Sequence, residues 1–281
     1  MRLLIFGMGY TSKVLAAQLR AAGWDVEGTG RDGTVRFEDR DAVLAALAGA
    51  SHVLSSVPPA REGGDPVLDA YGEALQAAPA KWIGYLSSTG VYGDTGGAWV
   101  DETAEVGGGR RSARTAADLA WQALDSRVRV FRLPGIYGPG RSALDRVRDG
   151  AAKRIAMEGQ VFSRVHVSDI AAGVIAGMAG PAGVYNLADD EPLSQNAVIE
   201  EAARLMGIAP PPLQTLEEAA LSPMALAFYA ENRRVANGKA KRVLGWRPAY
   251  PTYREGLRAL NATTSPIIAK VAPEPASSDQ R

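Results

Sequence analysis

A glycine-rich turn close to the N-terminus has the spacing of a phosphate-binding loop. The segment FGMGYTS, residues 6–12, follows the apolar run LLIF and precedes a stretch with helical periodicity. Gly7 would permit the tight turn, and Gly9 would let the backbone approach a pyrophosphate, whose charge the N–H groups at the helix start would bind. Ser12 stands where the G-x-G-x-x-G pattern has its third glycine. We predict a dinucleotide site here; the alternative is a tight turn without a ligand.

The residues after the second predicted strand bear on which dinucleotide would bind. That strand, WDVEGT (24–29), is followed by Gly30, Arg31 and Asp32. An acid at this edge would hold the ribose 2′-OH of NAD, whereas Arg31 could pair bidentately with the 2′-phosphate of NADP. We predict NADP as the preferred cofactor over NAD. In the alternative, Arg31 is a solvated loop charge and Asp32 is the ribose ligand.

Short apolar runs alternate with longer helical ones over residues 1–140. The runs that predict strands are 3–6, 24–29, 52–57, 81–88 and 128–133, and those that predict helices are 10–22, 39–48, 65–77 and 111–125. This alternation predicts an α/β fold, a doubly wound Rossmann-type parallel sheet covered by helices on both faces. Such a sheet binds ligands at the carboxyl ends of its strands. The residues that we expect to contact the cofactor there are Gly7, Gly9, Tyr10, Thr11, Ser12, Arg31, Ser56, Val57, Pro58, Pro134 and Gly135.

After residue 140 the alternation of predicted strands and helices becomes less regular. Helices are predicted at 142–150, 168–179, 194–206, 215–231 and 252–261, with strands near 161–166 and at 184–187. We interpret residues 1–140 as a dinucleotide-binding domain and 141–262 as a small C-terminal α+β substrate lobe, partly interleaved with the sheet. Residues 263–281 are rich in Pro, Ser and Ala and are predicted to form a disordered tail.

Composition excludes several classes of protein. The 281 residues are 46% apolar and 22% charged, which is ordinary for a globular chain. Lys+Arg and Asp+Glu number 31 each, so no broad cationic field would attract nucleic acid or an anionic membrane. The apolar run LLIF is too short for a secretory signal, and no apolar stretch reaches the about 18 residues of a transmembrane helix. With no cysteine and two histidines, we expect no metal site and a cytoplasmic location.

Further motifs resemble one family. LSSTGVYGD (86–94), FRLPGIYGPG (131–140), RVHVSDIA (164–171) and YNLADDEPLS (185–194) resemble segments of the extended short-chain dehydrogenase/reductases. SVPP (56–59) with Gly64-Asp65-Pro66, and the closing LGWRPAYPTYREGL (244–257), resemble an atypical subgroup of that superfamily, the NAD-dependent epimerase/dehydratase-like proteins. The likeness covers roughly residues 2–262. It implies the Rossmann-type fold, an NAD(P) cofactor, a catalytic Ser/Thr position that falls on Ser88, and a homodimer as the default expectation.

The catalytic pair of that family is altered in this chain. The family has Tyr and Lys four residues apart on the helix after the serine strand, and RRSARTAADLAW (110–121) places Arg110 and Arg114 there. Arg114 could supply charge and ribose contacts, whereas Arg110 could polarise a carbonyl or grip an anion but not shuttle a proton. Three alternatives stay open. In the first, Tyr92 or Tyr137 carries the proton; in the second, Ser88 donates the proton, with a water molecule behind it in the proton path. In the third, hydride chemistry is absent.

The predicted substrate contacts are Tyr137, Arg164 and His166. Arg164 is the candidate for the arginine with which relatives hold a diphosphate, but it lies about two residues later than theirs. Four arginines could together form a positively charged entrance to the site, called here the basic mouth, that binds an anion: Arg110, Arg111, Arg114 and Arg164. Alternatively, they could be solvated surface charges. We therefore expect an NADP-dependent enzyme that reduces, oxidises or epimerises a small polar metabolite, which would be anionic if the basic mouth exists. The alternative is a non-catalytic NADP(H)-binding sensor or scaffold.

Overall fold

A six-stranded parallel sheet forms the centre of the molecule. The computed structural model describes residues 1–107 and 112–264. The strand order is β10-β6-β4-β3-β1-β2, and the bounds are β1 Arg2–Phe6, β2 Asp25–Gly28, β3 His52–Ser55, β4 Trp82–Ser88, β6 Val128–Leu133 and β10 Gly183–Asn186. This order confirms the predicted doubly wound fold, whose topological switch lies between β1 and β3.

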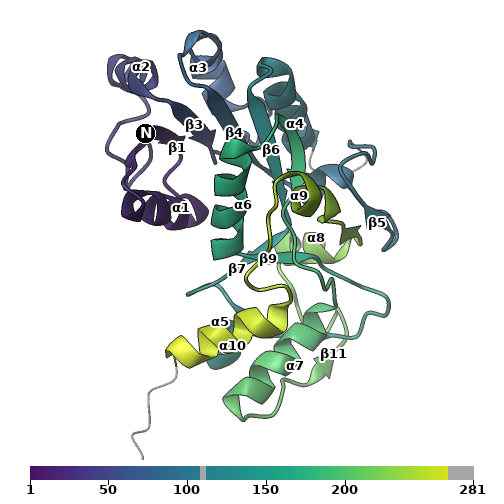
Figure 1. The fold of residues 1–281 in the computed structure, drawn as a ribbon. Helices are drawn as coiled ribbons and strands as arrows, with labels where there is room; N and C mark the ends of the chain where they lie inside the picture. The colour runs from purple at the N-terminus through teal and green to yellow at the C-terminus, as the bar shows by residue number, and fades with distance from the viewer. Residues whose placement is uncertain (108–111, 265–281) are drawn as a thin grey trace, which may run out of the picture.

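Helices cover both faces of this sheet (Figure 1). α1 (Tyr10–Ala21), α6 (Val167–Ala179) and α9 (Gly238–Val243) pack on one face through a core that includes Leu15, Ile170, Val174 and Ala240. α2 (Arg40–Gly49), α3 (Pro66–Ala77) and α4 (Ser112–Leu124) pack on the other through Val43, Leu75 and Trp121. Burial of apolar side chains on both faces explains why the central strands read as continuous apolar runs. Within the described ranges, no helix combines the length and apolarity needed to cross a bilayer.

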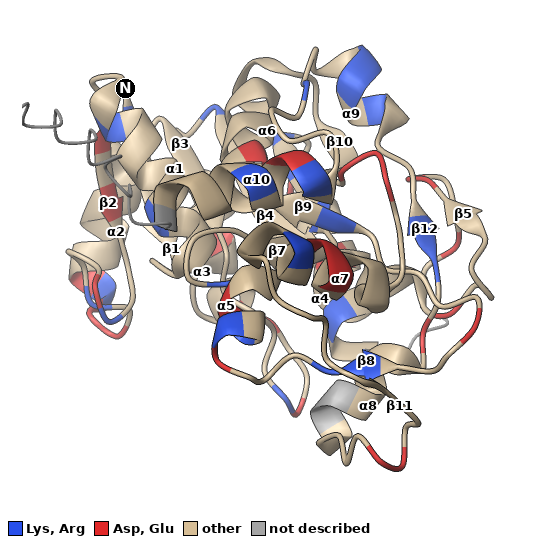
Figure 2. Ribbon diagram, turned by 90° about the horizontal axis from the view of Figure 1, so that it is seen from below, with Lys and Arg blue, Asp and Glu red and all other residues tan. Residues whose placement is uncertain are grey.

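A second, smaller core lies beyond the carboxyl edge of the sheet. α5 (Ala143–Arg148), α7 (Gln195–Met206) and α10 (Tyr253–Thr264) meet there through Leu144, Ile199, Ala202 and Leu257. Among the described residues, two two-stranded sheets connect this lobe to the rest: β7 Gly135–Tyr137 with β9 Arg164–His166, and β5 Trp99–Val100 with β12 Arg234–Val235. A third, β8 Arg154–Ile155 with β11 Leu213–Gln214, lies within the lobe. Basic and acidic residues are interspersed over the ribbon (Figure 2).

The segment 215–231 corrects one of the predictions. In place of one long helix, the structure has a turn followed by the short helix α8, Pro223–Tyr229. Thr215 and Glu218 exchange hydrogen bonds across the turn, and Ala220 adopts a positive φ of 42°. Pro223 lacks an N–H group and cannot continue a helix from the preceding turn, so α8 starts afresh there. Of the predicted tail, residues 263 and 264 end α10, and 265–281 lie outside the described residues.

Candidate functional site

A cavity of about 990 Å³ runs from the carboxyl edge of the sheet into the lobe. It gathers many of the residues predicted from the sequence: Gly9, Tyr10, Thr11, Ser56, Pro58, Ser88, Arg114, Pro134, Gly135, Tyr137 and Arg164. Other predicted residues lie outside its lining: Gly7, Ser12, Arg31, Val57, Tyr92 and His166. Arg110, together with its neighbour Arg111, falls outside the described residues. The cavity occupies the crevice where doubly wound sheets bind their ligands.

The glycine turn has the shape that a pyrophosphate requires. Gly7 has a φ of +90°, and a Cβ there would lie 2.9 Å from the Ser56 hydroxyl and 3.1 Å from a methyl of Val57. Gly9 is the N-cap of α1, lines the cavity, and has nothing within 4 Å of the place where a Cβ would be. The backbone is therefore open beside the start of a helix, where N–H groups and the helix dipole favour an anion.

Ser12 and Ser56 hold this turn in place. The Ser12 hydroxyl donates to Ser56 at 2.9 Å, and the Ser56 hydroxyl donates to the carbonyl of Gly7 at 2.6 Å. Ser12 is fully buried, so it fixes the close approach of α1 to the end of β3. Tyr10 reaches in the other direction, because its hydroxyl donates to the carbonyl of Pro139 at 3.1 Å. The predicted cofactor loop is thus tied to two neighbouring loops.

The edge that would select the dinucleotide carries two cations and one acid. Arg31 is exposed in the turn after β2. Asp32 pairs with Lys13 of α1, with 2.6 Å between the carboxylate and ammonium, and this hydrogen bond lowers the pKa of Asp32. A carboxylate that is already paired is a weaker acceptor for a ribose hydroxyl, and Arg31 and Lys13 leave the edge positive. This arrangement favours a 2′-phosphate over a 2′-OH.

Ser88 and Arg114 line the cavity near the centre of the sheet edge. The Ser88 hydroxyl accepts a hydrogen bond from the Gly90 N–H at 3.1 Å, at the start of the 3₁₀ turn Thr89–Tyr92. Because a hydroxyl can accept and donate at once, Ser88 retains a proton to offer to a ligand. Arg114 lies close to the Tyr85 hydroxyl, whose pKa burial raises to about 12. The pair provides a donor and a positive charge at one edge of the cavity.

Tyr92 belongs to a buried polar network instead. Its hydroxyl donates to Asn186 at 2.8 Å and accepts from Arg132 at 3.1 Å, and the residue is 4% exposed. Arg132 forms an ion pair with Asp118 at 2.8 Å, and Asp118 also accepts from Ser87 at 2.5 Å. Burial raises the pKa of Tyr92, which keeps the hydroxyl protonated. The contacts favour a packing role for Tyr92 over the alternative in which it carries the proton.

The side chains predicted to contact the substrate also make contacts within the protein. The Arg164 guanidinium donates to the carbonyls of Phe162 at 3.0 Å and Leu193 at 3.1 Å. The His166 Nδ1 accepts from the Ser168 N–H at 3.2 Å, and burial lowers the pKa of His166 to about 4. A Cβ at Gly256 would lie 2.1 Å from the Tyr137 hydroxyl, so that hydroxyl packs against α10. Arg164 and Tyr137 line the cavity, whereas His166 is a neutral helix cap.

A buried carboxylate in this region should make stability depend on pH. Burial raises the pKa of Asp189 from 3.8 to about 8, against the opposing effect of Arg164. The folded state therefore holds a proton that the unfolded state releases, and the contribution of Asp189 to the free energy of unfolding falls as the pH rises from about 4 to 8. Burial lowers the pKa of His52 and of His166 to about 4, and both oppose this trend below their ordinary value of 6.5. We expect a loss of up to about 1.4 kcal/mol per pH unit between pH 6.5 and 8.

The measurement is urea unfolding of the wild type and Asp189→Asn at several pH values in that interval. An asparagine side chain cannot ionise, so the variant should show a flatter dependence of the unfolding free energy on pH. Equal slopes for the two proteins would contradict the assignment.

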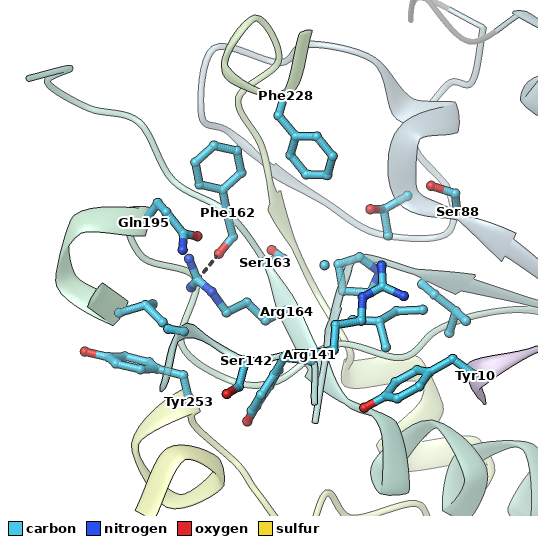
Figure 3. Close-up of a pocket in the computed structure, with 18 of the residues that line it drawn as sticks. Tyr10, Ser88, Arg141, Ser142, Phe162, Ser163, Arg164, Gln195, Phe228 and Tyr253 are labelled. Carbon is cyan, nitrogen blue, oxygen red and sulfur yellow. Dashed lines mark hydrogen bonds between the residues drawn. The ribbon is translucent and has the colours of Figure 1, made fainter. Parts of the chain in front are cut away.

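The lobe supplies cavity residues that sequence reasoning missed. They include Arg141, Arg146, Lys153, Phe162, Gln195, Phe228 and Arg233. Figure 3 shows Phe162, Arg164, Gln195 and Tyr253 toward one end of the cavity and Tyr10 and Ser88 toward the other. Arg141 directly follows FRLPGIYGPG, Gln195 directly follows YNLADDEPLS, and Phe162 lies two residues before Arg164, so their neighbours in sequence offered a signal. The others come from segments without a recognisable motif.

Comparison with curated proteins gives two informative relatives. The chain is 30% identical over 238 residues to Protein YeeZ of Escherichia coli strain K12, a match that spans 75% of this chain and 85% of YeeZ. It is 29% identical over 307 residues to a 3-diazoavenalumate denitrifying reductase of a Streptomyces species, spanning 92% of this chain and 99% of the reductase. No family model matches the chain.

Three solved structures share the fold. A putative NAD-dependent epimerase/dehydratase from Methylobacillus flagellatus has 25% identity and a TM-score of 0.70, over 93% of this chain and 98% of the other. A functionally unknown conserved protein from Silicibacter pomeroyi DSS has 44% identity and a TM-score of 0.84, over 93% of this chain and 98% of the other. The human epimerase family protein SDR39U1, solved with NADPH, has 18% identity and a TM-score of 0.75, over 93% and 99% of the two chains. At the lower identity the likeness concerns the fold alone.

Proposed function

Because this chain belongs to the atypical extended short-chain dehydrogenase/reductase family of NAD-dependent epimerase/dehydratase-like proteins, we propose that it binds NADP(H) in preference to NAD(H). The observation that carries dinucleotide binding is the open backbone at Gly9, beside the first turn of α1 and inside the cavity, and the exposed Arg31 beside Lys13 carries the preference. The pyrophosphate would lie there, and Arg31 with Lys13 would face the 2′-phosphate. SDR39U1, a protein of the same fold, was solved with NADPH.

We propose that the protein is an oxidoreductase or epimerase acting on a small polar, anionic metabolite. A bound nicotinamide supplies hydride exchange with a carbon atom of the substrate. Ser88 would hydrogen-bond the reacting oxygen, and the charge of Arg114 would stabilise negative charge that develops on it. One relative is named a reductase, which favours the enzyme.

The altered catalytic pair favours a second candidate function, that of a non-catalytic sensor that binds the dinucleotide. Tyr92 is committed to Asn186 and Arg132, and an arginine, Arg114, stands where the family has its lysine. Slow consumption of NADPH in the presence of a panel of carbonyl metabolites separates the two functions, since only the enzyme would show it.

The test of the cofactor proposal is calorimetric titration with NADPH, NADP⁺, NADH and NAD⁺. We expect NADPH to bind at least tenfold more tightly than NADH, about 1.4 kcal/mol. Arg31→Ala should remove that preference by weakening NADPH alone, because the 2′-phosphate loses its partner. Arg36→Ala, an exposed arginine of the same loop, serves as the control and should change neither affinity. Failure of all four dinucleotides to bind would overturn the proposal.

A further inference from the structure

The lobe end of the cavity is walled by aromatic rings that the dinucleotide site does not use. The ring of Phe162 lies 6.2 Å from that of Phe228 and 5.6 Å from that of Tyr229, measured between centroids. All three residues line the cavity, as do the aliphatic side chains of Val161 and Leu221. Figure 3 shows Phe162 and Phe228 next to each other on the same wall. A flat apolar group would gain free energy by covering this surface, through area burial and ring–ring contact.

One cation at this end differs from its neighbours in what it contacts. Arg164 donates to backbone carbonyls, Lys153 donates to the carbonyl of Ala219, and Arg233 donates to Gly93 and pairs with Glu231. Arg146 of α5 lines the cavity and is exposed, and across the described ranges the structure shows no hydrogen bond or ion pair from its guanidinium. Its charge acts on the Tyr229 hydroxyl, whose pKa burial raises and Arg146 lowers. Arg146 thus stands beside the aromatic wall with its donors available.

This composition does not suit a nucleotide sugar. A diphosphate needs several cationic or polar donors, and the arginine expected to grip it, Arg164, is 6% exposed and bound to carbonyls. Arg141 also lines the cavity, but its guanidinium lies 5.7 Å from the ring centroid of Tyr10, toward the dinucleotide end. At the lobe end, the guanidinium of Arg146 next to apolar rings matches one carboxylate attached to one flat ring. A planar carboxylate can also pair bidentately with guanidinium.

We infer that the lobe end of the cavity binds a small aryl acid. The aromatic ring packs on Phe162 and Phe228, and the carboxylate pairs with Arg146. This inference names the substrate class of the proposed enzyme and rests on the proposed function for its reaction. The binding itself depends on protein side chains alone, and it can be measured with and without a dinucleotide.

The experiment is calorimetry with four probes, on protein without cofactor and on protein saturated with NADP⁺. Cinnamate carries both the ring and the charge, cinnamamide keeps the ring without the charge, hexanoate keeps the charge without the ring, and UDP-glucose represents the nucleotide sugars. We expect cinnamate to bind at least tenfold more tightly than each of the other three. Absence of cinnamate binding in both states, or tighter binding of UDP-glucose, would overturn the inference.

Matched variants locate the site. Arg146→Gln should weaken cinnamate at least tenfold and leave cinnamamide unchanged, whereas Phe162→Leu should weaken both ligands because it removes the ring and keeps an apolar side chain. Arg148→Gln on the same helix and Leu226→Ala on α8 are the controls, and both should retain wild-type affinity. Unchanged cinnamate affinity in Arg146→Gln and Phe162→Leu would contradict the inference.

The two proposals fail separately. Protein that binds cinnamate as expected but none of the four dinucleotides overturns the proposed cofactor and keeps the aryl-acid site. Protein that binds NADPH but not cinnamate overturns the aryl-acid site and leaves the cofactor proposal standing.

Discussion

Replacing Gly9 by valine should lower the affinity for NADPH at least a hundredfold, about 2.7 kcal/mol, while the protein stays folded. The backbone of Gly9 has a φ of −83° and a ψ of −168°, which a branched residue adopts without strain. The Cβ of the added side chain enters space where nothing lies within 4 Å in the structure. In our proposal that space belongs to the pyrophosphate, so the side chain competes with the cofactor and not with the fold. Calorimetry gives the affinity and thermal unfolding gives the stability.

Gly72→Ala is the control for that experiment. Gly72 lies in α3, far along the chain from the glycine turn, and a Cβ there also meets nothing within 4 Å. The control should leave NADPH affinity unchanged and raise stability slightly, because alanine favours helix over glycine. Wild-type NADPH affinity in Gly9→Val would exclude the glycine turn as the pyrophosphate site.

The sheet and its covering helices could be predicted because their signals are local. VRVFRL (128–133) and HVLS (52–55) carry apolar side chains on both sides of the strand, which is typical of a strand buried on two faces. Asp65 followed by Pro66 predicts a helix start, and the Asp65 carboxylate does accept from the Val67 N–H at 3.0 Å. The family resemblance likewise rests on short local motifs that occur in the family's order along the chain, and the comparisons confirm it.

The residues at the lobe end of the site could not be predicted from the sequence, because tertiary contacts bring them together. Phe162, Phe228 and Arg146 come from three separate segments, and each alone is an ordinary core or surface residue. The helix predicted over 215–231 was wrong because apolar periodicity outweighed the proline at 223. Arg164 was expected to meet the ligand, and no sequence pattern reveals that backbone carbonyls use its donors. Such competition between partners exists only in the folded chain.

Replacing Asp118 by leucine should reduce the free energy of unfolding by about 3–5 kcal/mol. Asp118 is fully buried, and its partner Arg132 is 3% exposed. The carboxylate accepts from Arg132 at 2.8 and 3.1 Å and from Gln122 at 2.7 Å. Without this carboxylate, the guanidinium of Arg132 stays buried with no opposite charge. The expected loss is a large part of the free energy of unfolding of a typical domain, which is about 5–15 kcal/mol. Urea unfolding followed by circular dichroism measures the change.

A second variant separates charge from packing as the cause of that loss. The double change Asp118→Leu with Arg132→Met removes both charges and keeps apolar volume, so it should recover at least half of the lost stability. Lys13→Gln breaks an ion pair whose side chains are 53% and 56% exposed, and it should leave the free energy of unfolding nearly unchanged. If the double variant were as unstable as Asp118→Leu alone, lost packing would be the cause. The network would then owe its stability to the fit of Tyr92 over Arg132, whose guanidinium lies 4.9 Å from the ring centroid.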